Sequence, residues 1–585
     1  MKNFLKMMLA TMAGMLLLGL LLFLFALVAG LSAMSGGVTV KPKSVLVMDL
    51  KNMEVRERVE PDDPAAILIS SQGGGCIGLN DWLHVLEKAA DDQNISGISL
   101  ELGQLVASPA TTEAMRDALL RFRESGKFVY AYGISMGLND YYLATASDSI
   151  FLHPMGSLMF KGLSAQVMFY KDLLDKLDVE VQVVRHGTFK SAVEPFISKR
   201  MSEANRLQIT EYLESLWGTF CADIAAARRL DVRSIRVVAD NLMLFDNPQA
   251  ALSTRFVDVL AYEDVYHSDL KKRADAHDTS KVSEVAYSDY LKNVTNTSSA
   301  PYKVAVVYAV GTITDGEGGT EEIGENILET LGKLRKDKSV KAVVLRVNSG
   351  GGSGLMSERI WREVTLLKQE RPVIVSMGDY AASGGYYIAC AADCIVSEPM
   401  TITGSIGVFG MMPNLGRTLS EKMGIRVETV NTNQSSDWMN GMRSMTGFEY
   451  DIMQQSVDRF YDTFVRRVAD GRRLGVKYVD QIAQGRVWTG RDALGKGLVD
   501  TLGGLDLAIR MAAEQAKLSK YTVWERPYME PFFSRMLSTL SGTRIGFRRQ
   551  GVSVPAVFAP YYALEKTLRE QSGVQAMLPY QITIQ

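Results

Sequence analysis

The distribution of apolar and polar positions divides the chain into a long apolar start and a body of alternating short segments. Residues 7–34 carry no charged side chain. A membrane-spanning helix needs about 20 apolar residues, whereas the apolar part of a cleavable signal has only about 7–15. The pattern therefore predicts a single N-terminal transmembrane anchor at residues 1–36; a signal cleaved near Ala33 is the alternative. Lys2 and Lys6 precede the span, which favours a cytoplasmic N-terminus and an extracytoplasmic body.

Within the body, apolar runs of strand length alternate with amphipathic helical segments. Val340–Val347 is rich in β-branched residues and predicts a buried strand, and Met356–Gln369 carries apolar residues at helical spacing. A further strand is predicted at Val373–Met377 and a small-residue helix at Gly384–Ala392. This alternation indicates an α/β fold whose parallel sheet is covered on both faces.

The body contains an internal duplication. Residues 95–163 align with residues 340–408 at a constant offset of 245 positions, without gaps. Further matches keep nearly the same offset: Tyr141-Tyr142 with Tyr386-Tyr387, Arg228 with Arg472, and Asp258 with Asp500. Solenoid repeats have periods of about 20–50 residues, so this longer period predicts two copies of one domain.

These patterns predict five regions along the chain. A stretch rich in Ser, Thr, Asn, Asp and Lys separates the two copies and is typical of a linker, and a tail with scattered prolines follows the second copy. The predicted regions are the anchor at 1–36, a first copy at 43–275, a linker at 276–301, a second copy at 302–518 and a C-terminal extension at 519–585.

Composition excludes several classes of function. The net charge of −2 provides no basic excess for a nucleic-acid partner. Four cysteines in 585 residues cannot form a disulfide framework, and five scattered histidines form no zinc site. Cys390 and Cys394 are expected in one helical turn as buried free thiols. We therefore expect neither a metal nor a cofactor.

Glycine-rich elements of the second copy are the first candidates for chemistry. The loop at 348–354 follows a predicted strand and precedes a helix, so its backbone N–H groups suit an anion or a developing oxyanion; a purely structural loop is the alternative. It lacks the spacing of nucleotide-binding loops. Ser405 lies between glycines that would expose its hydroxyl, although such turns are common. In the first copy, Met159-Phe160 stand where Gly404-Ser405 stand, so the fold does not require this serine.

A nucleophilic serine needs a base, and the second copy contains no histidine. His186 in the first copy is a weak candidate, because a histidine in a polar loop is usually only solvated. Lys190 lies among Gly, Phe, Ala and Val residues, where burial would lower its pKa from about 10.4 toward 7–8; a surface lysine is the alternative. The aligned position in the second copy is Ser435 or Ser436. The second copy therefore lacks the lysine, and the first copy lacks the serine.

With these motifs in order, the chain resembles the signal peptide peptidase A (protease IV) family of the long, tandem-domain type. The resemblance rests on the segments Gly187–Phe196, Asp379–Gly385, Thr403–Gly410, Gly485–Gly490 and Gly497–Asp500. It implies tandem crotonase/ClpP-like domains of ββα superhelical units, with Ser405 as nucleophile and Lys190 as general base. The family's loop reads Asn-Ser-Pro-Gly-Gly, and Gly350 replaces the proline here; Gly351 and Ile406 are the expected oxyanion donors.

The resemblance also implies a membrane-anchored serine endopeptidase that cleaves apolar peptides such as signal-peptide remnants. Its implied setting is the bacterial inner membrane, crossed once, with a periplasmic body in a homo-oligomer, a tetramer in the family. Two alternatives stay open. One is a catalytically weak membrane-associated scaffold of the same family, and the other is a crotonase-like acyl-CoA enzyme, which the extracytoplasmic location disfavours.

Overall fold

The computed structural model of the protein describes residues 14–15, 18, 39–59, 74–274, 283–294, 300–319, 321–529 and 573–577. The predicted anchor at residues 1–36 therefore lies outside the described ranges, apart from positions 14, 15 and 18. Within those ranges, no helix combines the length and the apolar character that a bilayer crossing needs.

The first copy folds around a six-stranded sheet in which all neighbouring strands are parallel. In order across the sheet, the strands are β8 (Val259–Leu260), β6 (Ser149–Leu158), β5 (Phe128–Met136), β4 (Ile95–Leu102), β1 (Ser44–Asp49) and β9 (Glu284–Ala286). Parallel neighbours require crossovers, which helices provide. These helices include α3 (Leu79–Asp91), α4 (Pro109–Glu124), α5 (Leu138–Ala144), α9 (Val232–Asp240), α10 (Pro248–Ser253) and α11 (Glu263–Arg273).

The second copy repeats this arrangement. Its strands, in order, are β19 (Val487–Thr489), β17 (Ile402–Gly404), β15 (Val373–Ala382), β13 (Val340–Ser349), β10 (Lys303–Val310) and β21 (Thr522–Arg526). In addition, β16 (Cys394–Ser397) pairs with β15, and β20 (Thr501–Leu502) pairs with β16. Only the β17–β19 pair in this sheet is antiparallel. The helices are α13 (Glu325–Lys336), α14 (Gly354–Lys368), α15 (Gly384–Ala389), α16 (Gly447–Arg472), α17 (Val476–Ile482), α18 (Gly490–Gly495) and α19 (Leu505–Gln515).

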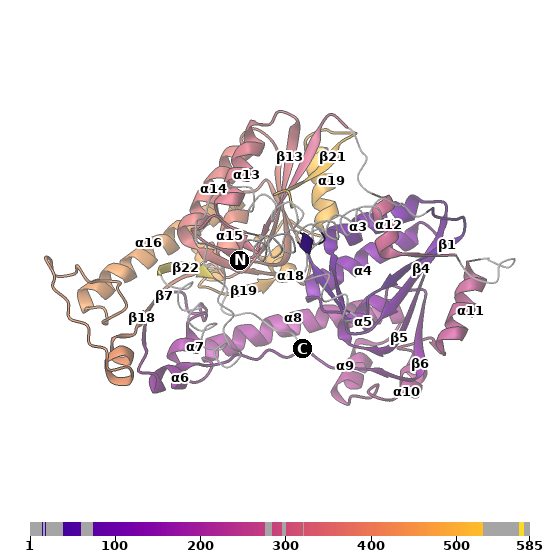
Figure 1. The fold of residues 1–585 in the computed structure, drawn as a ribbon, viewed down its shortest axis with the longest axis horizontal. Coiled ribbons are helices and arrows are strands. Elements are labelled where there is room, and N and C mark those ends of the chain that lie inside the picture. The colour runs from indigo at the N-terminus through magenta and orange to yellow at the C-terminus, as the bar shows by residue number, and fades with distance from the viewer. Residues whose placement is uncertain are drawn as a thin grey trace, which may run out of the picture.

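Strand β10 shows how the second sheet is buried on both faces. Its alternate residues Ala305 and Val307 belong to the core that contains α13 and α14, whereas Val304 and Val306 pack with α19. Successive side chains of a strand point to opposite faces, so a continuous apolar run suits a sheet covered on both sides. Figure 1 shows this copy at the top, the first copy at the right, and α8 (Glu203–Arg228) running beneath them.

The first copy extends beyond its predicted end by a strand and a helix, and the second by a strand. The range predicted as a linker, 276–301, contains β9 and α12 (Tyr287–Asn293), and Val285 and Tyr290 are buried in the first core. The predicted C-terminal extension contributes β21, which pairs with β10 as β9 pairs with β1. These strands have only three and five residues, too few to show a strand pattern in a polar segment.

A third sheet joins the two copies. In order, its strands are β12 (Glu322–Ile323), β11 (Thr312–Ile313), β14 (Gly351–Ser353), β22 (Gly573–Met577), β18 (Val408–Asn414) and β7 (Glu180–His186). Strand β7 belongs to the first copy and pairs antiparallel with β18 of the second, with His186 opposite Val408 and Glu180 opposite Asn414. This pairing sets the relative position of the segments that follow β7 and precede β18.

The helices and strands predicted in the second copy are confirmed as β13, α14, β15 and α15, but one local prediction is wrong. Helix α15 ends at Ala389, Cys390 follows as its cap, and Cys394 already begins β16, so these cysteines do not share a helical turn. At this turn, the Asp393 carboxylate accepts a hydrogen bond from the N–H of Val373 at the start of β15 (2.9 Å). Both Cys390 and Cys394 are free thiols and are buried, as expected.

Candidate active site

Lys190 is fully buried where the two copies meet. It follows β7 in a turn whose Phe189 N–H donates to the carbonyl of Gln484 in the second copy (2.8 Å). Two glycines of the second copy make room for the lysine. A Cβ on Gly485 would lie 2.6 Å from the backbone nitrogen of Lys190, and a Cβ on Gly407 would lie 3.2 Å from the Cδ of its side chain. Gly407, just before β18, and Gly485, just before β19, therefore leave the space that Lys190 of the first copy occupies.

Two serines of the second copy contact the Lys190 amine. Its Nζ lies 3.0 Å from the Oγ of Ser405 and 3.2 Å from the Ser405 carbonyl oxygen. The nearest contact, at 2.7 Å, is with the Oγ of Ser383. All three side chains are fully buried. The structure thus brings Lys190 and Ser405 together within one chain, and it adds Ser383, a residue of the quoted motifs to which the sequence assigned no role.

The two serines differ in their backbone setting. Ser383 connects β15 to α15 with φ 56° and ψ −116°, a conformation that is sparsely populated by residues other than glycine and that concentrates at functional sites. Ser405 also has a positive φ, 51°, but its N–H donates to the carbonyl of Arg486 (2.7 Å) at the end of the β17–β19 pair. The Ser383 N–H likewise donates to the carbonyl of Gly404 (2.8 Å), so what distinguishes Ser383 is its place on a sharp strand-to-helix turn.

Burial lowers the pKa of Lys190 well below its usual range. A charged ammonium in this site loses its hydration, and no carboxylate compensates, since its hydrogen-bond partners are serine oxygens. A neutral amine has two N–H donors and one lone pair. The carbonyl and the hydroxyl of Ser405 offer two acceptors for the N–H groups, which leaves the lone pair for the O–H of Ser383.

The predicted oxyanion loop lies beside Ser383. Gly385, two residues after Ser383, packs so closely on the loop that a Cβ there would lie 2.5 Å from the carbonyl oxygen of Ser349. The loop leads directly into α14 at Gly354, as predicted. It also forms β14, and the Gly351 N–H donates to the Ser349 hydroxyl (3.1 Å). Ile406 is the other predicted donor residue, and its carbonyl oxygen accepts a hydrogen bond from the Gly485 N–H (2.8 Å).

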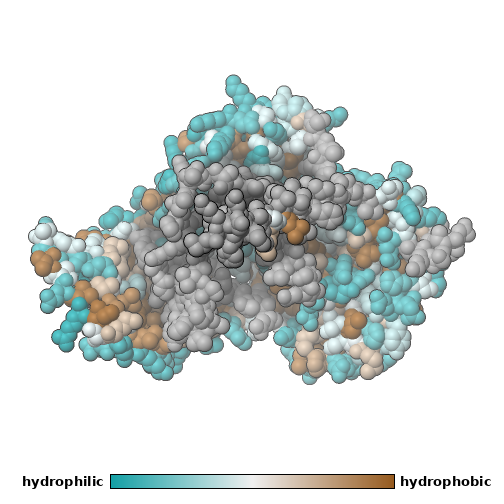
Figure 2. Space-filling view, viewed as in Figure 1, coloured by the Kyte–Doolittle hydropathy of each residue, from teal (hydrophilic) through white to brown (hydrophobic). Residues whose placement is uncertain are grey.

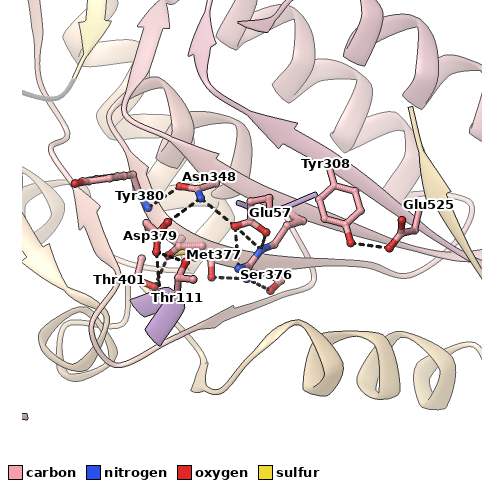
Figure 3. Close-up of polar contacts among 12 residues, drawn as sticks. Glu57, Thr111, Tyr308, Asn348, Ser376, Met377, Asp379, Tyr380, Thr401 and Glu525 are labelled. Atoms are coloured by element: carbon pink, nitrogen blue, oxygen red, sulfur yellow. Dashed lines mark hydrogen bonds and ion pairs between the residues drawn. The ribbon is translucent and has the colours of Figure 1, made fainter. Parts of the chain in front are cut away.

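The first copy also fixes the strands that lead to both loops (Figure 3). Buried Arg346 forms an ion pair with Glu57 of the first copy (3.0 Å). The side-chain amide of Asn348 donates to Glu57 (3.0 Å) and to Asp379 (3.1 Å), and Asp379 accepts from the N–H and the hydroxyl of Thr111 in α4 (3.0 and 2.7 Å). The glycine loop after β13 and the Ser383 turn after β15 are thereby tied to one another and to the first copy.

The remaining candidates contribute no chemistry here. His186 shares a hydrogen bond with Asp458 (2.8 Å) and stacks on Tyr461 with 3.9 Å between ring centroids, a structural role in the interface. Among the described residues, no group of three or more His, Cys, Asp or Glu side chains is placed to hold a metal ion.

A buried lysine among serine hydroxyls, next to a glycine loop, is the arrangement of serine hydrolases that use lysine in place of histidine. A sequence profile described as Peptidase family S49 matches the chain twice, at residues 121–277 and 365–519, once in each copy. The chain belongs to this family, which confirms the resemblance drawn from the motifs.

Named relatives match most of the chain. "Protease 4" of Salmonella typhi is 37% identical over 454 residues, 76% of this chain and 73% of that protein. "Protease 4" of Haemophilus influenzae is 33% identical over 571 residues, 93% of this chain and 92% of that protein. The chloroplastic serine protease SPPA of Arabidopsis thaliana is 32% identical over 477 residues, 79% of this chain and 70% of that protein.

Among solved structures, a mutant of ClpP1 from Listeria monocytogenes aligns over 35% of this chain and 94% of its own, with a TM-score of 0.25 and 14% identity. A score this low carries no argument about the fold. What the structure itself shows is a pair of related α/β domains.

Proposed function

We propose that this chain is a serine endopeptidase in which one copy of the domain supplies the base and the other the nucleophile. The observation that carries the proposal is the fully buried Lys190, whose amine touches two serine hydroxyls of the second copy. Family membership supports the same reaction, as do the names of the relatives. The proposal includes a crotonase/ClpP-like fold for each of the two domains.

The contacts favour Ser383 over Ser405 as the nucleophile. Ser405 presents two acceptor atoms to Lys190, so it orients the amine, whereas Ser383 is the nearer hydroxyl and lies on the sharp turn next to the glycine loop. A nucleophile on a strand-to-helix turn uses the N–H of the following residue as an oxyanion donor. For Ser383 that donor is Gly384, with Gly351 opposite; for Ser405 it is Ile406, as the sequence predicted.

The proposed reaction needs no cofactor. Neutral Lys190 takes the proton of the Ser383 hydroxyl while Oγ attacks the peptide carbonyl, and the backbone N–H groups stabilise the oxyanion. The lysine ammonium then gives its proton to the leaving amine, which leaves an acyl ester on the serine. A water molecule, deprotonated by the same amine, hydrolyses the ester.

The third sheet supports an extended peptide as substrate. Strand β22 pairs antiparallel with β14 on one side and with β18 on the other. The space between the glycine loop and β18 therefore accepts a chain in strand conformation, and backbone pairing recognises peptides without regard to sequence. Apolar peptides such as signal-peptide remnants fit the proposed location, a single-pass inner-membrane protein with a periplasmic body.

A homo-oligomer belongs to the same proposal. Ile425, Val427 and Val430 align with Val179, Val181 and Val184 around β7, but they are 53–99% exposed. They lie in the segment 415–446, toward the left end of the molecule where Figure 2 shows apolar residues on the surface. The first-copy counterpart of β18, residues 163–169, pairs with no strand in the described ranges. Residues 425–431 of a second chain placed against it would reproduce the β7–β18 pairing.

Substitution of each serine in turn tests the assignment. Ser383→Ala should lower kcat on an apolar peptide by about 10⁴-fold or more, as loss of a nucleophile does. Ser405→Ala removes one hydrogen bond to the amine and should cost about 10–100-fold. A fluorophosphonate, followed by mass spectrometry, should modify Ser383.

The reverse outcome would restore the original prediction. If Ser405 carries the fluorophosphonate and Ser383→Ala keeps most of its activity, Ser405 is the nucleophile. If the correctly assembled wild-type protein neither cleaves peptides nor reacts with fluorophosphonate, the scaffold alternative is favoured.

A further inference from the structure

The first copy contains a cavity at the place where the second copy has its candidate active site. The cavity has a volume of about 540 Å³ and is lined by Leu105, Leu138, Met159, Leu163 and Phe220, among others. At the offset of 245, Leu138 stands where Ser383 stands, Met159 where Gly404 stands and Leu163 where Val408 stands. The duplication has thus kept a hollow and replaced its reactive serine with an apolar side chain.

The first-copy loop that corresponds to the glycine loop has its N–H groups engaged by a side chain. Buried Asp140 stands where Gly385 stands, and its carboxylate accepts from the N–H groups of Gln104 (3.0 Å), Leu105 (3.1 Å) and Gly137 (2.9 Å). The N–H of Val106, which stands where Gly351 stands, donates to the carbonyl of Met53 (2.8 Å), so none of these N–H groups is left for the oxyanion of a substrate. The first-copy cavity therefore cannot activate a carbonyl, and any ligand would be bound unchanged.

The walls of the cavity match those of the substrate space in the second copy. There, β14 pairs with β11, and β22 fills the space between β14 and β18. In the first copy, β2 (Met53–Arg56) forms the equivalent bridge from Glu54 to Val106, next to β3 (Gly75–Gly78). On the far side lie residues 163–169, which have no strand partner in the described ranges and of which alternate residues are half-buried. The position that β22 fills in the second copy is the cavity in the first.

We propose that the first copy binds an extended apolar peptide in this cavity, as a non-catalytic second site in each chain. Backbone groups of residues 163–169 pair with the peptide, and its apolar side chains enter the space around Leu138, Met159 and Phe220. The choice of ligand rests on the proposed peptidase function. Binding itself does not depend on catalysis, so it is measured in the full-length Ser383→Ala variant.

The probe is a ten-residue peptide of alanine and leucine with lysines at its ends, a fluorophore and one photoreactive leucine. After irradiation, mass spectrometry should find it attached between residues 104 and 163 in the first copy. In the second copy it should be attached near β14 or β18, where it takes the place of β22. Gly162→Trp, added to the inactive variant, should reduce first-copy labelling at least tenfold and leave second-copy labelling unchanged. Gly162 lines the cavity, and a Cβ there would meet no atom within 4 Å, so the position has room for a side chain.

Gly475→Trp is the matched control, because Gly475 also has open space around it and is not in a left-handed conformation. It should leave both labels unchanged. The proposal is overturned if the first copy is not labelled, if Gly162→Trp does not reduce its label, or if cross-linking shows a segment of a second chain filling the cavity. Hydrolysis of a short peptide by otherwise wild-type Gly162→Trp protein, expected unchanged, tests the peptidase function separately.

Discussion

Tyr141 in the first copy and Tyr386 in the second occupy equivalent positions, and each donates its hydroxyl to a backbone carbonyl late in its own copy: Phe256 (3.0 Å) and Leu498 (2.8 Å). Arg228 with Asp258 and Arg472 with Asp500 form equivalent ion pairs. Residues shared by the two copies therefore hold the sheets and helices together.

The positions that differ between the copies have a different distribution. Leu138 against Ser383 and Asp140 against Gly385 lie at the ends of the central strands, around one space that is a cavity in the first copy and the candidate active site in the second. The comparison teaches that identity between the copies marks the fold, whereas divergence between them marks the chemistry. Substitutions at individual residues of the two copies test this rule.

Apart from loss of the nucleophile, the largest effect is expected from the one residue that the first copy gives to the second. Lys190→Met should lower kcat by about 10³-fold or more, because it removes the general base. Peptide hydrolysis by the wild type should rise with pH through the lowered pKa of this amine. Lys199→Met, an exposed lysine of the same copy that pairs with Asp172, is the control and should keep full activity. Unchanged hydrolysis by Lys190→Met would remove the lysine from the mechanism.

A smaller effect should distinguish the equivalent positions 385 and 140. Gly385→Ala places a Cβ 2.5 Å from the Ser349 carbonyl oxygen and displaces the glycine loop, so kcat should fall by about 10²-fold. Asp140→Ala leaves three N–H groups of the first copy without their acceptor and should lower the free energy of unfolding by about 1–3 kcal/mol, with kcat on short peptides unchanged. Thermal unfolding and peptide kinetics on both variants measure this. Loss of kcat in Asp140→Ala would contradict the division of roles.

The smallest effect concerns what the buried amine does to stability. The unfolded chain keeps the usual lysine pKa near 10.5, whereas burial lowers the pKa in the folded protein. Between the two values the unfolded state binds more protons, so the stability of the wild type rises with pH through this window. Lys190→Met lacks this titration, and its Tm should exceed that of the wild type at pH 7, with the difference shrinking toward pH 10. A difference that is constant with pH would show that the amine does not titrate as proposed.

The duplication and the central strands were predicted from periodic and local signals in the sequence. The meeting of Lys190 with Ser405 was predicted from the family resemblance of their motifs. The sequence did not assign Ser383, since a serine before two glycines looks like any turn until the lysine amine is placed against it. The edge strands β9 and β21 were missed because they are short and gain their stability from the neighbouring strand. The Asp140 carboxylate was missed because only the folded loop brings three N–H groups to it.

The pairing of β7 with β18 also orders events during synthesis. Lys190 precedes Ser383 by 193 positions, so a growing chain carries the base long before it carries either serine. At about 5–20 residues per second, that interval is about 10–40 s. During it, the first copy can fold while the chain has no means of cleaving a peptide. The proposed peptidase activity is thus absent from every incomplete chain until β18 has been made and has paired with β7.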